Sequence, residues 1–159
     1  MDLYKPSLIK SKRAKIHDDY VLAEINHLCF VSKSFEAVLA IDVLEHLKKV
    51  DDISLIKNIE KIAKYAALVF TPNGFLPQSE YDGNILQIHQ SGWTVAELKS
   101  LGFRVYGING LKFLRKEEAE NRFKPQILFD EVSAVSQKLA NRFPSIAFQL
   151  LCVKKLETK

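Results

Sequence analysis

The stretch that decides the fold is Phe35–Leu47, with the sequence FEAVLAIDVLEHL. Its first part, residues 35–41, is a nearly continuous apolar run, which is typical of a strand buried on both faces of a parallel sheet. The run stops at Asp42, and a short helix is expected to open with Glu45 and His46. Open α/β sheets bind their ligands at the carboxyl ends of the strands. The segment therefore predicts an α/β fold with polar side chains at a ligand-binding edge.

Strand and helix patterns alternate on both sides of this stretch. Strands are expected at 1–4, 20–23, 65–70, 103–108 and 145–153, and helices at 7–15, from 51 onward, at 95–101 and at 127–141. Asp51–Asp52 and Thr94 are suitable helix caps, because their side chains can accept the free N–H groups of a first turn. This alternation predicts a three-layer sandwich with a mostly parallel sheet and an antiparallel last strand. We expect residues 1–159 to form a single domain.

Composition gives weaker indications of partners and location. The net charge of +4 and the pI near 9.0 permit a nucleic-acid partner without requiring one, and the basic run 5–15 favours a solvated helix face. The sequence has no apolar stretch of the roughly 20 residues that span a bilayer, so we expect a cytoplasmic protein. Cys29 and Cys152 lie in apolar runs, which predicts buried thiols. The scattered histidines predict no metal site.

Several segments resemble one enzyme family. AIDVLEHL at 40–47 resembles the motif after the fourth strand of class I S-adenosylmethionine (SAM) dependent methyltransferases, of the type 11-like kind. FTPNGF at 70–75 resembles the turn after their fifth strand, and IHQSGWTVAELKSLGFRVYGINGLKF at 88–113 is similar to a later segment of one branch. The resemblance covers most of the chain. It implies a Rossmann-like methyltransferase fold, SAM as cofactor, and methyl transfer to an oxygen, nitrogen or carbon atom.

The resemblance also implies which residues bind the cofactor. In MDLY at 1–4, Asp2 matches the acidic residue that accepts both ribose hydroxyls of SAM, a role that suits an ionised carboxylate. The alternative for Asp2 is an exposed terminal aspartate. In VLAEINHLCF at 21–30, Glu24 stands where the family usually has the Asp that accepts from the adenine amino group. Ile25 would flank the adenine ring, and Leu3 and Tyr4 would line its other side. Asp42 would lie near the methionine part of the cofactor or near the acceptor.

Three further residues are candidates on the acceptor side. His46 is either a catalytic base or a pocket-lining residue, because methyl transfer depends chiefly on alignment and needs a base only for some nucleophiles. His89 and Trp93 could line the substrate pocket, although a tryptophan more often packs in the core. The acceptor is expected to be a small molecule or a lipid-linked glycan bound under the loop 75–91. A nucleic acid also remains open.

The family places a strand and a glycine-rich G-x-G-x-G turn before the position of Asp2, whereas the first glycine here is Gly74. The chain therefore resembles a member without its first strand. A shortened sequence, a natural remnant that no longer binds SAM, and a partner chain that supplies the strand are the three explanations. Exposed strand edges predict self-association and impaired cofactor binding. The alternatives in other classes are a non-catalytic protein-interaction module and a nucleic-acid-binding domain with salt-sensitive binding.

Overall fold

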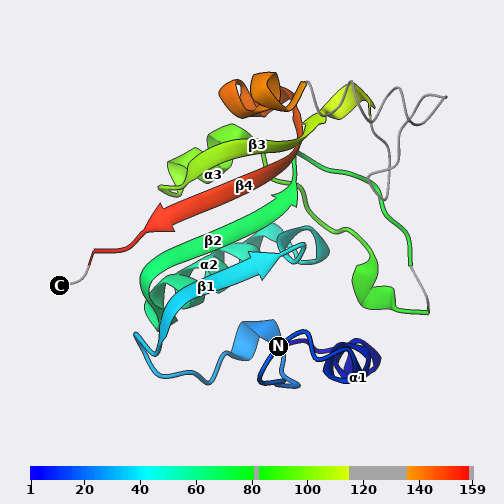
Figure 1. Ribbon diagram of the computed structural model, residues 1–159, viewed down its shortest axis with the longest axis vertical. Coiled ribbons are helices and arrows are strands. Elements are labelled where there is room, and N and C mark those ends of the chain that lie inside the picture. Colours follow the sequence, from blue (N-terminus) through cyan, green and yellow to red (C-terminus); the bar gives the residue numbers. More distant parts are fainter. Residues whose placement is uncertain (81–82, 115–135, 158–159) are drawn as a thin grey trace.

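The computed structural model describes residues 1–80, 83–114 and 136–157. Figure 1 shows the chain running from an N-terminal helix at one end of the sheet to a C-terminal strand inside it. The helices and strands are α1 (Lys5–Arg13), β1 (Phe35–Ile41), α2 (Lys49–Ile62), β2 (Ala63–Pro72), α3 (Val95–Ser100), β3 (Arg104–Leu111) and β4 (Ala147–Lys155). Short 3-10 turns include η1 (Ile25–His27), η2 (Leu44–His46) and η3 (Ile85–Gln87). The strand predicted at 35–41 is confirmed at both ends. Its predicted burial on both faces is wrong, because α2 and α3 cover only one face of the sheet and Leu39 and Ile41 are exposed on the other.

The four strands form one mixed sheet in the order β1-β2-β4-β3. β1 and β2 are parallel, whereas β4 is antiparallel to both β2 and β3. The antiparallel last strand is thus confirmed, but the prediction of a mostly parallel sheet is wrong, because two of the three pairings are antiparallel. The reason is that β4 lies between β2 and β3 instead of at an edge, so that one reversed strand makes two antiparallel ladders.

Both main helices pack on the same face of the sheet. Leu55, Ile56 and Ile59 of α2 join Leu98 of α3 in one buried cluster with strand residues such as Val69. In Figure 1, α2 lies behind β1 and β2. On the other face, apolar side chains line a shallow hollow that we call the open face: Leu39, Ile41, Leu68, Phe70 and Leu151. The described residues thus show two layers, and the expected third layer is not seen in them.

A local capping signal explains the start of α3 but not that of α2. Thr94 and Glu97 form a capping box at the start of α3, and Gly102, at φ +87°, follows its end. Thr94 as a cap is therefore confirmed. The predicted cap at Asp51–Asp52 is wrong, because α2 already begins at Lys49 and has no side-chain cap. The two aspartates lie in its first turn, where negative charge is favourable near the helix N-terminus.

The N-terminal segment lies beside the sheet without joining it. Its two predicted strands are reduced to a parallel bridge between Asp2 and Leu22, in which the Asp2 N–H donates to Val21 O at 3.1 Å. Among the described residues, β1 has a strand partner only on the side of β2. The buried thiol predicted at Cys152 is confirmed, whereas the one predicted at Cys29 is wrong: Cys29 is exposed, and its neighbours Ile25 and Leu28 are the residues of that segment that pack against the core.

Two remaining sequence expectations concern helices. Residues 127–135 of the predicted helix 127–141 lie outside the described residues, while residues 136–142 are helical. In the part of the chain that the structure describes, no helix has the length and apolar character needed to cross a membrane.

Candidate functional site

The site begins where β1 ends. Asp42 adopts φ +48°, a left-handed conformation that short polar residues tolerate better than other side chains, and its N–H donates to Phe70 O at 2.9 Å. This sharp turn leads directly into η2, which carries Glu45 and His46. Leu44 is fully buried and holds the turn against the core. The polar residues of the motif AIDVLEHL are thereby fixed at the carboxyl edge of the sheet.

A pocket of about 380 Å³ lies between this edge and the N-terminal segment, and we call it the first pocket. All five residues predicted to bind the cofactor line it: Asp2, Leu3, Glu24, Ile25 and Asp42. They come from three separate segments that the fold brings together. Their roles toward a cofactor stay predictions.

The two carboxylates on the N-terminal side of the first pocket are solvent-exposed and locally held. The Tyr4 N–H donates to Asp2 Oδ1 at 2.8 Å, which orients that carboxylate within its turn. Glu24 Oε2 lies 3.2 Å from His27 Nδ1. Each therefore keeps an acceptor oxygen that can turn toward a ligand, since an ionised carboxylate has about four acceptor sites.

A second pocket of about 300 Å³ adjoins the first. Asp42, His46 and Gln87 line both pockets and form their shared wall. His89 lines the second pocket, as does Glu45, which the sequence analysis placed in a helix but gave no role at the site. The remaining lining side chains are Pro72, Leu76, Gln78, Phe148 and Gln149.

The loop before α3 brings His89 to this place. The backbone oxygen of Glu45 accepts from the N–H groups of Gln90 at 2.7 Å and Ser91 at 3.1 Å, and Gln90 Nε2 donates to His46 O at 2.7 Å. These bonds tie the loop to η2. As a result, the rings of His46 and His89 stand edge to face with their centroids 4.8 Å apart.

Burial shapes the titration of the groups in the second pocket. Glu45 is only 3% exposed, and this burial is the main reason why its pKa rises to about 7. The negative charge of Asp42 raises the pKa of Glu45 further. Partial desolvation also raises the pKa of Asp42. Burial, followed by the neighbouring His89, lowers the pKa of His46, so its neutral form is favoured. The site therefore holds acidic and imidazole groups away from their ordinary ionisation.

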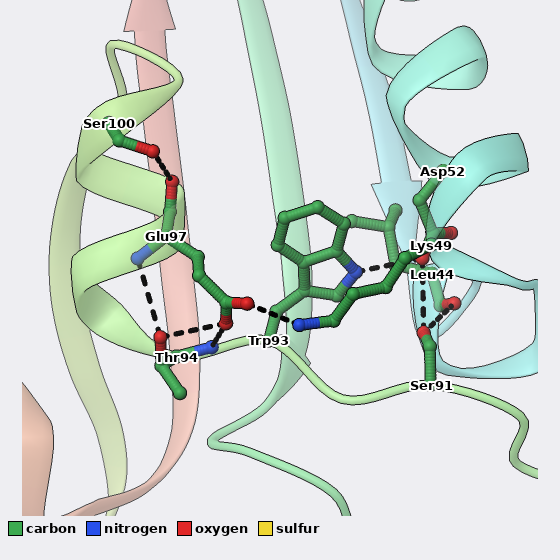
Figure 2. Close-up of polar contacts among 8 residues, drawn as sticks. All are labelled: Leu44, Lys49, Asp52, Ser91, Trp93, Thr94, Glu97 and Ser100. Atoms are coloured by element: carbon green, nitrogen blue, oxygen red, sulfur yellow. Dashed lines mark hydrogen bonds and ion pairs between the residues drawn. The ribbon is translucent and has the colours of Figure 1, made fainter.

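Trp93 lies elsewhere. It is 3% exposed, and its Nε1 donates to Asp52 Oδ2 at 2.8 Å (Figure 2). Lys49 Nζ lies 5.0 Å from the centroid of its ring. Trp93 lines neither pocket, so the structure favours the core-packing alternative over a substrate-binding role.

Solved structures provide the comparison with known proteins. A SAM-dependent methyltransferase from Archaeoglobus fulgidus superimposes with a TM-score of 0.54 at 17% identity, covering 96% of this chain and 73% of that one. The methyltransferase fold is shared. A Pyrococcus horikoshii OT3 protein gives a TM-score of 0.53 at 11% identity, covering 98% of this chain and 69% of that one. A structure of the complex between the Haloferax volcanii Trm112 methyltransferase activator and its proposed methyltransferase gives a TM-score of 0.53 at 14% identity. The match covers 97% of this chain and 68% of that one.

At these identities the similarity shows a methyltransferase-like fold and nothing finer. No protein family model matches the chain. No curated protein matches it either.

Proposed function

We propose that this chain is a SAM-dependent methyltransferase domain that binds SAM in the first pocket and the methyl acceptor in the second. The observation that carries the proposal is the convergence of the five predicted cofactor residues on one cavity. Its volume of about 380 Å³ falls within the roughly 300–1,000 Å³ of ligand pockets. The methyltransferase-like fold of the structural neighbours supports it.

Each residue has a role that its chemistry suits. Asp2 accepts from the two ribose hydroxyls, and Glu24 accepts from the adenine amino group. Leu3 and Ile25 provide the apolar surfaces beside the adenine ring. Asp42, on the shared wall, lies nearest to the acceptor side and is assigned to the methionine part of SAM.

The shared wall is where the methyl group would pass between the pockets. In methyl transfer, the nucleophile of the acceptor attacks the methyl carbon in line, and the electron pair of the carbon–sulfur bond stays on sulfur. Catalysis then depends chiefly on holding the two reactants in this alignment. Asp42, His46 and Gln87 are the residues placed to do so, because they line both pockets.

The second pocket favours a small polar acceptor, or the exposed polar end of a larger one. Its volume is about 300 Å³, and glutamines, two carboxylates and two histidines contribute to its wall. These side chains can donate and accept hydrogen bonds to hydroxyl or amine groups. A small molecule or a glycan fits this lining better than an apolar acceptor does.

Calorimetry with S-adenosylhomocysteine tests the proposal. We expect Asp2→Ala to weaken binding at least tenfold, because the ribose hydroxyls lose their charged acceptor. Asp19→Ala is the matched control, since Asp19 is an exposed aspartate outside the first pocket, and it should leave binding unchanged. Equal binding by the wild type and Asp2→Ala would defeat the ribose assignment, and no binding by the wild type at millimolar ligand would defeat the proposal.

A second candidate function is a non-catalytic interaction module that associates with another copy of the chain. The open face favours it, as does the edge of β1, which has no strand partner among the described residues, because Leu39 and Ile41 are 56% and 57% exposed beside that edge. An unpaired strand edge next to exposed apolar side chains is a template for pairing with another chain. Self-association is compatible with methyl transfer, since the face and the first pocket share only Ile41.

A further inference from the structure

We propose that Glu45, His46 and His89 bind a divalent transition-metal ion in the second pocket. Each of the three side chains offers one ligand atom, and these atoms all lie within 4.8 Å of one another. The three residues have no regular ligand spacing along the chain, which is why no metal site was expected from the sequence. His89 reaches the other two only through the loop that is hydrogen-bonded to η2.

The hydrogen bond of His89 is the first supporting observation. Its Nδ1 lies 2.5 Å from Leu76 O. A carbonyl oxygen can only accept, so Nδ1 carries the proton and the neutral ring keeps its lone pair on Nε2. Histidines that bind metals almost always donate their other ring N–H to a carbonyl or a carboxylate, which fixes the tautomer and the ring orientation. His89 thus has the arrangement of a metal ligand before any metal is present.

His46 provides the second observation. Its Nδ1 is shielded from solvent and has no hydrogen-bond partner in the described structure. A buried polar atom without a partner is destabilising, and such atoms in folded proteins call for an explanation such as a bound ion. Coordination to a cation would satisfy this nitrogen.

Glu45 supplies the charge. Its carboxyl group is buried, and Oε2 accepts a hydrogen bond of 3.0 Å from Thr71 Oγ1, as expected for a supported metal-binding carboxylate. Asp42 lines the same pocket and adds a second carboxylate close by. Two acidic groups in one partly buried pocket repel each other when both are ionised. A cation bound beside them would offset this electrostatic repulsion.

The donor set identifies the class of ion. Two imidazoles and one carboxylate match catalytic zinc sites and non-haem iron(II) sites, whereas Mg²⁺ and Ca²⁺ prefer oxygen ligands alone. Metal–ligand bonds of about 2.0–2.2 Å would bring the three ligand atoms closer together than they are now, and rotation of their side chains would achieve this. Three protein ligands leave coordination positions that open into the second pocket.

The open coordination positions suggest that the ion binds the methyl acceptor. This part of the inference rests on the proposed methyltransferase function. An oxygen of the acceptor would complete the coordination next to the shared wall. His46 would then act as a ligand and would not accept the proton of the acceptor.

The test uses metal-free protein prepared with EDTA and then desalted. We expect Co²⁺ to bind one per chain, with visible d–d absorption, and Zn²⁺ to displace it, whereas excess Mg²⁺ should not. His46→Gln and His89→Gln should each weaken Co²⁺ binding at least tenfold. His27→Gln is the matched control, because the His27 side chain is 78% exposed and outside the cluster, and it should bind as the wild type does.

A second measurement keeps the test decisive if a variant does not fold. Zn²⁺ added to the wild type should shift the imidazole ¹⁵N signals of His46 and His89 and leave those of His17 and His27 in place. No one-to-one binding, shifts confined to His17 and His27, or full binding by folded His89→Gln would overturn the proposal. Calorimetry with S-adenosylhomocysteine in the presence of EDTA measures cofactor binding without metal. Failure of the metal proposal and failure of the cofactor proposal can therefore be told apart.

Discussion

Trp93 Nε1 donates a hydrogen bond of 2.8 Å to Oδ2 of Asp52 and thereby joins the segment before α3 to the first turn of α2 (Figure 2). Asp52 is fully buried, and Ser91 Oγ lies 3.0 Å from the same oxygen. Ser91 Oγ also lies 3.0 Å from Leu44 O. A hydroxyl has one proton and a carbonyl only accepts, so both contacts of Ser91 are satisfied together only when Asp52 is protonated.

Asp52 is therefore expected to make the protein less stable as the pH rises. Burial raises its pKa from 3.8 to about 7, so between these values the folded state holds a proton that the unfolded state has released. The free energy of unfolding then falls with rising pH across this window. The full change corresponds to roughly 4 kcal/mol as an upper bound, from 1.36 kcal/mol per pKa unit.

Urea denaturation at pH 5, 6, 7 and 8 measures this effect. Asp52→Asn keeps an acceptor for Trp93 and cannot ionise, so its unfolding free energy should vary less over this range than that of the wild type. Asp51→Asn, on the same turn, should keep the wild-type slope. Parallel curves for the wild type and Asp52→Asn would show that Asp52 does not titrate in this window.

Removing the indole donor should destabilise the fold. Trp93→Phe leaves most of the apolar surface but deprives a buried carboxyl group of a hydrogen bond, at a cost of about 1–3 kcal/mol. The loss should be larger at pH 8 than at pH 5, because an ionised Asp52 depends more on its donors. Urea denaturation followed by far-UV circular dichroism measures this loss in the free energy of unfolding. Phe113→Leu, at a side chain that is 59% exposed, should stay within about 0.5 kcal/mol of the wild type.

Gly92 is expected to control the shape of the second pocket. A Cβ atom at this position would lie 2.2 Å from Phe75 N, a contact with backbone that cannot move aside cheaply. Gly92→Ala should therefore push apart the two arms of the loop 75–91 and cost about 1–3 kcal/mol of stability. It should also weaken Co²⁺ binding through His89. Gly83→Ala is the comparison: no atom lies within 4 Å of its Cβ position, but Gly83 has φ +69°, so this substitution should cost only the roughly 1–2 kcal/mol of left-handed backbone strain and leave Co²⁺ binding unchanged.

The open face should drive self-association. We expect sedimentation velocity to show a concentration-dependent dimer for the wild type and a monomer for Leu39→Lys, because a charge in the apolar hollow cannot be buried without a partner. Val50→Lys changes an apolar side chain that is 68% exposed outside this face, and it should still dimerise. A monomeric wild type at all concentrations would contradict the prediction.

The sequence was most informative where a signal is local. The apolar run 35–41 predicted the bounds of β1, and Thr94 predicted the start of α3, because a strand-forming run and a helix cap depend on neighbours in the chain. The exposure of β1 was not predicted, because it depends on which face of the sheet the helices cover. The five residues that the family resemblance assigned to the cofactor line one pocket, and their roles stay predictions. Cys29 and the cap of α2 were predicted wrongly, since exposure and helix starts there follow from how the N-terminal segment and η2 pack.

Sequence alone determined an α/β chain whose polar motif AIDVLEHL stands at a strand end. Only the tertiary structure decided that β4 enters between β2 and β3, that the sheet keeps an open face, and that His89 meets Glu45 and His46. Strand order and long-range side-chain contacts depend on how distant segments pack. Hydrophobic periodicity reports only which residues of one segment share a face, so it does not predict them. Local pattern fixes which side chains can react, and packing fixes which of them meet.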